Sequence, residues 1–368
     1  MLSRSESIAP LAVGLTLLIG VGVGLGAGRL IDDKADPVPA AEATKVIPDR
    51  VGRGEKSAAP EKNRGRKSAL PEASDDATAL QYPDRERLDA ALKLGAATAK
   101  RFGGTVETAI LLPGWSQPLT VGNPRRRSRM WSLAKPVTAI AAQRAPGGPT
   151  PAVRAAIQVA IQRSENCAQR RVVLEVQELA GGMSEAKDGL VEIIRESGAR
   201  VVTTDQAAPA PPACEAYLRK TGEGLKDPLG STLQLGTWTW TVADAVQFAA
   251  GLGNGTYREA GAAVVLDMER PKRASSEATS EEHTMTPDFG AGKVWPQVAY
   301  KSGWGGSLQD DFVVGQYGSV EGGGSIVAFA VVFHPGAAHQ PEIDDPGRTR
   351  ADEAIQAVLN PVKLALAE

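Results

Sequence analysis

The chain has 368 residues, of which 42% are hydrophobic, so it can hold one large domain or two ordinary ones with extensions. Its formal net charge of −2 gives no reason to expect a nucleic-acid partner. The two cysteines and three histidines form no group with metal-ligand spacing. We therefore expect neither a metal site nor a cofactor.

The N-terminal region indicates attachment to a membrane. Residues 8–28 carry no charge and are about long enough to cross a bilayer. A cleavable signal peptide is the alternative, although its apolar region is usually shorter, about 7–15 residues. We expect residues 1–28 to be an anchor, or a signal segment of a secreted protein if they are cleaved. The flanking charges are too balanced to set the orientation.

A composition change follows this segment. Residues 29–82 are rich in proline, alanine and charged side chains and have almost no large apolar ones. Such a composition cannot bury a core and predicts a flexible, charged stalk. An anchor and a stalk predict a globular domain over residues 83–368 that works just outside a cell membrane.

The globular region begins with a helical pattern and two strands. Apolar residues recur at helical spacing over residues 84–102, which predicts an amphipathic helix. Residues 105–112 are rich in β-branched and apolar side chains and are followed by Pro113-Gly114, so they predict a strand that enters a turn. Residues 117–121 are expected to form the returning strand.

Residues 130–142 predict the start of a helix that carries Ser132 and Lys135 on one face, because the two are three residues apart. Pro136 fits only in the first turn, so this helix begins at about Ser132. The helix N-terminus supplies N–H groups and a positive dipole that suit an oxyanion beside the serine. A dry, cation-rich site would let Lys135 take the serine proton. The pair predicts an acyl-transfer centre, but a second Ser-x-x-Lys at 184–187 shows that this motif alone is weak.

The middle of the chain reads as largely helical. Thr150 and Pro151 predict an N-cap and the first position of a helix that reaches residue 162. A long helical pattern continues through residues 172–179 to Gly181-Gly182. Further helices are expected over 184–197 and 242–252, whereas 199–236 are irregular.

The last third has strand composition over residues 298–303, 311–317 and 325–333, and a final helix over 350–367. Strands at both ends of the domain with helices between them predict one α+β unit. Distant segments are therefore expected to close its sheet.

Ser164 and Asn166 stand at the end of an apolar helical stretch. In a turn between helices, both side chains reach one cavity. There the serine would relay a proton, and the amide would hold Lys135 or a substrate carbonyl. The alternative is a helix–helix turn that the serine and the asparagine only cap.

Lys301 and Ser302 directly follow a predicted strand. Both would reach an anion if the strand edges a cleft, and Gly303 would let a substrate backbone approach closely. The alternative is an exposed strand end with a solvated lysine. The similar sequence at 220–222 has no strand before it, so we discard it on context.

Three short motifs, in this order, resemble those of the penicillin-binding protein and serine β-lactamase superfamily: Ser132-x-x-Lys135, Ser164-x-Asn166 and Lys301-Ser302-Gly303. The elements around the motifs also resemble that family's layout, over about residues 84–367. The resemblance implies an α+β fold, with an antiparallel sheet flanked by N- and C-terminal helices plus a helical subdomain.

The resemblance also implies roles for the residues of the first two motifs. Ser132 would be the acylated nucleophile and Lys135 its proton acceptor. Ser164 would shuttle a proton to the leaving group, and Asn166 would position the substrate.

In the third motif, the resemblance implies that Lys301 and Ser302 bind the carboxylate of a D-alanyl peptide or β-lactam. The backbone N–H groups of Ser132 and Trp304, which follows Gly303, would form the oxyanion hole. The implied partners are a small peptide or β-lactam substrate and the peptidoglycan of the cell wall.

The sequence departs from the family's pattern at several points. The spacing of 32 residues from Ser132 to Ser164 is short for the family, and Glu165 stands where an aspartate or a small residue is usual. The lactamases hold a glutamate in an Ω-loop that activates the deacylating water. Glu215 stands in the right stretch as a possible deacylation base, but Arg219 replaces the family's asparagine. Without such a base, a penicillin would acylate Ser132 and stay.

The two cysteines flank the same region. Cys167 directly follows Asn166, and Cys214 lies in the stretch that matches the Ω-loop. Outside the membrane they would form a disulfide that ties this loop to the active-site turn. The alternative is two free, buried thiols.

Taken with the resemblance, the motifs predict an extracytoplasmic serine hydrolase. Its expected reaction is D,D-peptidase-like or β-lactam-like amide hydrolysis through an acyl-Ser132 intermediate. A β-lactamase in the strict sense is the second enzymatic interpretation. The alternative from another class is a catalytically weak or inactive binding protein of the cell envelope that keeps the fold.

Overall fold

The computed structural model describes residues 84–209, 231–269, 289–305, 312–322, 325–336 and 346–367, together with Cys214. The anchor and the stalk expected over residues 1–82 lie outside these ranges. Within the described ranges, no helix is both long enough and apolar enough to span a bilayer.

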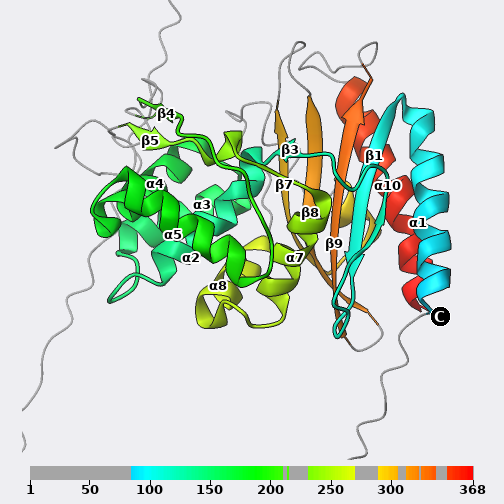
Figure 1. Cartoon of the computed structure of the whole chain (residues 1–368), viewed down its shortest axis with the longest axis horizontal. Helices are drawn as coiled ribbons and strands as arrows, with labels where there is room; N and C mark the ends of the chain where they lie inside the picture. The colour runs from blue at the N-terminus through cyan, green and yellow to red at the C-terminus, as the bar shows by residue number, and fades with distance from the viewer. Residues whose placement is uncertain are drawn as a thin grey trace, which may run out of the picture. The chain divides into compact units, whose positions relative to one another are not determined.

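A five-stranded antiparallel sheet with the order β2-β1-β9-β8-β7 forms the centre of the described fold (Figure 1). Its strands are β1 (Gly104–Leu111), β2 (Leu119–Val121), β7 (Val298–Gly305), β8 (Val313–Gly322) and β9 (Ser325–Pro335). The first strand, β1, pairs along its whole length with β9, from Gly104↔Pro335 to Leu111↔Ala328. This pairing confirms that distant segments close one sheet.

The two terminal helices, α1 (Arg85–Ala99) and α10 (Pro346–Ala367), lie side by side and cover one face of the sheet (Figure 1). Their backbones approach closely at Gly95, where an added Cβ would stand 2.7 Å from the Cα of Val358. The predicted helices at both ends of the domain are thereby confirmed, and α1 continues into the short 3₁₀ helix η1 (Lys100–Phe102).

The other face of the sheet is covered by α7 (Val242–Gly253), beyond which lies a helical subdomain (Figure 1). The subdomain consists of α2 (Lys135–Gln143), α3 (Pro151–Gln162), α4 (Asn166–Ala180), α5 (Met183–Glu196) and α8 (Arg258–Met268). Seven of the nine residues of α2 are buried, so this helix forms the core of the subdomain.

Short elements connect the larger ones. They are β3 (Ser128–Arg129), η2 (Trp131–Ala134), β4 (Ala207–Ala208), β5 (Thr232–Leu233), η3 (Leu235–Thr237), β6 (Thr239–Trp240) and α9 (Ala291–Val294).

Local sequence signals explain several of these boundaries. The Thr150 side chain accepts a hydrogen bond from the backbone N–H of Val153 at 3.3 Å, and Pro151 is the first residue of α3, as predicted. Pro136 lies in the first turn of α2, also as predicted. The structure adds α8, which no sequence signal predicted, and it divides the long helical pattern into α3 and α4, with α4 beginning at Asn166.

Candidate active site

Ser132 lies in η2, the 3₁₀ turn that leads directly into α2 at Lys135. The residue before it, Trp131, has φ of 44°, in the left-handed region that bulky side chains rarely adopt. The chain therefore enters the serine turn through a sharp, conformationally demanding step.

The serine turn rests directly on strand β7. A Cβ on Gly303 would stand 2.8 Å from the backbone nitrogen of Leu133 and 3.1 Å from the carbonyl oxygen of Met130. From the neighbouring strand β8, the Tyr317 hydroxyl donates to the Leu133 carbonyl at 3.0 Å. The sequence predicts that Gly303 admits a substrate backbone, whereas in the structure its absent side chain makes room for η2.

The first two motifs meet at the Lys135 ammonium group, which is buried. Its Nζ donates to the Ser164 backbone carbonyl, to Ser164 Oγ at 3.1 Å and to Asn166 Oδ1 at 2.8 Å. Both predicted residues of the second motif therefore hold the lysine of the first.

Lys301 of the third motif also contacts the Ser164 hydroxyl. Lys301 is 0% exposed, and its Nζ donates to Ser164 Oγ at 3.0 Å and to the Ser302 carbonyl at 2.8 Å. A hydroxyl oxygen can accept two hydrogen bonds, so Ser164 Oγ bridges the two lysines.

The Ser302 hydroxyl, unlike the Ser302 carbonyl, faces away from the two lysines. It accepts a hydrogen bond from Gln316 Nε2 at 2.9 Å, and Gln316 is the register partner of Ser302 on β8. Successive side chains of a strand point to opposite faces. Lys301 and Gly303 face the serine turn, so Ser302 faces the layer of α9 and α10. The carboxylate contact expected of the Ser302 hydroxyl is therefore not supported by its position.

A cavity of about 340 Å³ opens at this point between η2, α4 and η3. It is lined by Trp131, Ser132, Ala134, Lys135, Asn166, Cys167, Gln169, Arg170, Val173, Cys214, Thr232, Leu233, Gln234, Leu235, Gly236, Thr237 and Trp304. Four predicted site residues are thus at its surface: Ser132, Lys135, Asn166 and Trp304. Ser164 and Lys301 are buried: the Ser164 hydroxyl contacts Lys135, which lines the cavity, and Lys301 contacts that same hydroxyl.

The lining is apolar with a positive character. Its charged side chains are Lys135 and Arg170, and no carboxylate stands among the described residues that line it. Burial lowers the pKa of the Arg170 guanidinium below its ordinary value. Arg170 lies four residues after Asn166 on α4, a spacing that places both on one helical face and that could have predicted its position. Glu215, the possible deacylation base, lies outside the described residues.

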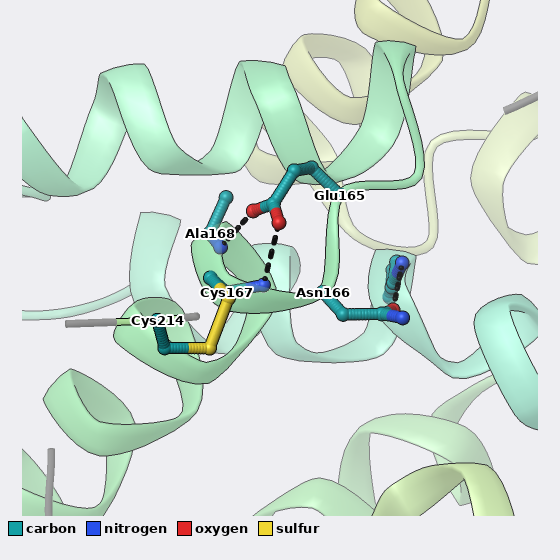
Figure 2. The surroundings of a disulfide bond; sticks show 6 residues. Glu165, Asn166, Cys167, Ala168 and Cys214 are labelled. Atoms are coloured by element: carbon teal, nitrogen blue, oxygen red, sulfur yellow. Dashed lines mark hydrogen bonds between the residues drawn. A yellow bond between two sulfur atoms is a disulfide. The ribbon is translucent and has the colours of Figure 1, made fainter. Parts of the chain in front are cut away.

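The turn that holds Lys135 is capped by Glu165. Its carboxylate accepts hydrogen bonds from the backbone N–H groups of Cys167, at 3.0 Å, and Ala168 (Figure 2). A negatively charged side chain at the start of a helix also interacts favourably with the helix dipole. The cap is therefore the glutamate, which leaves the side chains of Ser164 and Asn166 to Lys135.

The predicted disulfide is confirmed. Cys167, in the first turn of α4, is bonded to Cys214, with a Cα–Cα distance of 5.0 Å (Figure 2). Both cysteines are buried and both line the cavity. Within the described part of the chain, no three His, Cys, Asp or Glu side chains gather in a group that could hold a metal ion.

Neither a family model nor a curated protein matches this sequence. Solved structures do match. A β-lactamase from Desulfarculus baarsii DSM 2075 aligns with a TM-score of 0.50 at 18% identity, over 76% of this chain and 98% of that one. A β-lactamase from Streptosporangium roseum aligns with a TM-score of 0.50 at 14% identity, over 76% and 98%.

The chain thus has the α+β fold of these β-lactamases, which is the fold that the resemblance implied. At these identities, the likeness establishes the fold and leaves the reaction to the chain's own residues.

Proposed function

We propose that the chain is an extracytoplasmic serine acyl-transferase or hydrolase that acts on D-alanyl peptides or β-lactam-like amides. The observation that carries the proposal is the convergence of three distant motifs on one hydroxyl. Ser164 Oγ contacts both Lys135 Nζ and Lys301 Nζ, next to the cavity that exposes Ser132.

The reaction begins when Ser132 Oγ attacks the carbonyl carbon of the scissile amide and its proton passes to Lys135 Nζ. The backbone N–H groups of Ser132 and Trp304 stabilise the oxyanion of the tetrahedral intermediate. Ser164 then relays a proton from the lysine side to the leaving nitrogen, so the C–N bond breaks and an ester on Ser132 remains. Water completes hydrolysis by attacking that ester, which frees the acid and returns the proton to Ser132.

The cationic cavity supports a substrate with a carboxylate, as D-alanyl peptides and penicillins have. Lys135 and Arg170 line it, and Lys301 lies directly behind. Oppositely charged groups attract most strongly in a site from which water is partly excluded. Asn166 presents an amide at the cavity surface that can also hold a substrate carbonyl.

The proposed place of action is the outer side of a cell membrane, with peptidoglycan as the partner. The uncharged stretch 8–28 supports an anchor. The Cys167–Cys214 disulfide supports an oxidising compartment, because such bonds are rare in the cytosol.

The proposal is tested by following two reactions of the full chain. One is the release of D-alanine from a D-alanyl-D-alanine peptide, and the other is the opening of a penicillin ring. Release that disappears in Ser132→Ala supports a peptidase, and rapid ring opening supports a β-lactamase in the strict sense. Absence of both reactions contradicts the proposal.

One alternative is favoured by specific observations: a catalytically weak binding protein of the cell envelope. The Ser302 hydroxyl is bound to Gln316 on the far face of β7, and the described lining of the cavity has no carboxylate to activate water. Calorimetric binding of a cell-wall peptide by both wild type and Ser132→Ala, without release of D-alanine, would establish this alternative.

A further inference from the structure

Lys135 has three hydrogen-bond acceptors in the short turn from Ser164 to Asn166. Its Nζ donates to two oxygens of Ser164 and one of Asn166. Ser164 has φ of 56°, a left-handed conformation that costs free energy in a residue other than glycine. Such a conformation persists only where its surroundings hold it in place.

Two groups hold the turn on its C-terminal side. The Glu165 carboxylate caps the first N–H groups of α4, and the Cys167–Cys214 disulfide leaves the chain one residue after Asn166 (Figure 2). In Figure 2, the Asn166 side chain and the disulfide leave this first helical turn in different directions. The disulfide thus holds the backbone of the turn without blocking the asparagine.

The disulfide also lies at the candidate active site itself. Cys167 is 8% exposed and Cys214 is 1% exposed, and both line the cavity that holds Ser132. The two cysteines are separated by 47 positions, so the bond brings a distant part of the chain against the lysine turn.

We infer that the Cys167–Cys214 disulfide positions the general base: it fixes the first turn of α4 so that Ser164 and Asn166 keep Lys135 in place beside Ser132. The inference rests on the proposed function. The two cysteines are positioning residues, because they act on the reaction through Asn166 and Ser164. Without the bond, the Glu165 cap remains, but the tie between this turn and Cys214 is lost.

Removal of a positioning disulfide has a different effect on the reaction from removal of a purely stabilising one. If the disulfide only stabilises the fold, its removal lowers the melting temperature but leaves the acylation rate of the folded protein unchanged. If it positions Lys135, its removal slows acylation at saturating substrate, because displacement of a catalytic group by about 1 Å can cost up to about a hundredfold in rate. Substrate affinity changes little, since Lys301 and Arg170 remain.

The experiment measures acylation of the full chain by a fluorescent penicillin at several concentrations, which separates the saturating rate constant from the half-saturating concentration. The Cys167→Ser/Cys214→Ser double variant is compared with wild type. We expect the saturating rate constant to fall by about ten- to a hundredfold while the half-saturating concentration stays the same. Thr150→Ala is the matched control, because it lowers stability by removing the N-cap of α3, away from the turn, and should leave the saturating rate constant unchanged.

A second measurement avoids any folding defect of the double variant. Dithiothreitol reduces the disulfide of the wild-type chain to two thiols and is itself oxidised to its cyclic disulfide, and circular dichroism checks that the reduced chain stays folded. The rate constant should fall on reduction and return after reoxidation. Equal rates in the oxidised and reduced chains overturn the inference but leave the proposed function standing. Absence of acylation in the oxidised wild type overturns both.

Discussion

Ser164 Oγ lies 3.1 Å from Lys135 Nζ and 3.0 Å from Lys301 Nζ, although Lys301 stands 137 positions further along the chain. This hydroxyl joins the helical subdomain to the edge strand of the sheet. Because both amines are buried, they depend on protein oxygens in place of water. Ser164 is thus both the proposed proton relay and a structural acceptor.

Replacement of Ser164 should affect both roles. In Ser164→Ala, two buried amines lose a shared acceptor, and we expect a loss of about 1–3 kcal/mol in the free energy of unfolding. Acylation should slow by about 10²–10⁴-fold, as expected when a positioned proton-transfer group is lost. Urea unfolding and a penicillin acylation assay measure the two effects. Unchanged acylation in a folded Ser164→Ala variant would contradict the relay role.

The two Ser-x-x-Lys sequences provide a matched pair of lysines. Lys135→Ala should slow acylation by about 10²–10⁴-fold, because it removes the proposed proton acceptor. Lys187→Ala is the control. Lys187 lies on α5 and forms an ion pair with the exposed Asp205, and surface pairs contribute only about 0–1 kcal/mol. Equal acylation rates in the two variants would remove Lys135 from the mechanism.

The contact between the serine turn and β7 predicts a sensitive glycine. The methyl group of Gly303→Ala would stand 2.8 Å from Leu133, so η2 must move away from the strand. We expect a loss of stability of about 1–3 kcal/mol and a fall in the acylation rate of about tenfold or more.

Gly189→Ala serves as the control for this substitution. Gly189 lies in α5, and an added Cβ there would meet nothing within 4 Å. Alanine should raise the stability by about 0.5–1 kcal/mol and leave acylation unchanged. If the two alanine variants behave alike, Gly303 does not set the position of Ser132.

Buried tyrosines predict a loss of stability in alkali. Burial raises the pKa of Tyr317 well above its ordinary value of 10.0, and burial also raises the pKa of Tyr257. The unfolded chain therefore releases these protons at a lower pH than the folded one. Stability is fully present below about pH 10 and falls as the pH rises towards the raised values.

Urea unfolding midpoints measured on both sides of pH 10 test this prediction. Tyr317→Phe should be less stable than wild type at neutral pH by about 1–3 kcal/mol, because the Leu133 carbonyl loses its donor. Its midpoint should nevertheless decline less steeply above pH 10. A decline as steep as that of wild type would show that Tyr317 does not contribute to the alkaline loss.

Much of the architecture follows from local sequence signals. Thr150 and Pro151 mark the start of α3, Pro136 fixes the start of α2, and strand composition at both ends of the domain predicts that one sheet joins them. The order of the three motifs also predicted that Lys135, Ser164 and Lys301 belong to one site. The helix starts depend on near neighbours in the chain, so the sequence carries them directly, whereas the sheet and the lysine cluster also needed strand composition and the order of the motifs.

Other features depend on which surfaces meet. Alternation along a strand predicts that Lys301 and Ser302 face opposite sides, but only packing decides which side faces the serine turn. The contact between Gly303 and the serine turn likewise depends on how η2 packs on β7. The helix α8 contains Gly261, Val264 and Val265, which are weak helix formers, and its formation depends on packing against the rest of the subdomain.

The most direct test of the central claim is the intact mass of the full chain after incubation with a penicillin, for wild type and Ser132→Ala in parallel. The account predicts that wild type gains the mass of one penicillin and that Ser132→Ala gains none. A lasting adduct is expected unless Glu215, which lies outside the described residues, activates the deacylating water. Wild type that neither gains mass nor opens the penicillin ring, or Ser132→Ala that still gains mass, would contradict the assignment of Ser132 as the nucleophile.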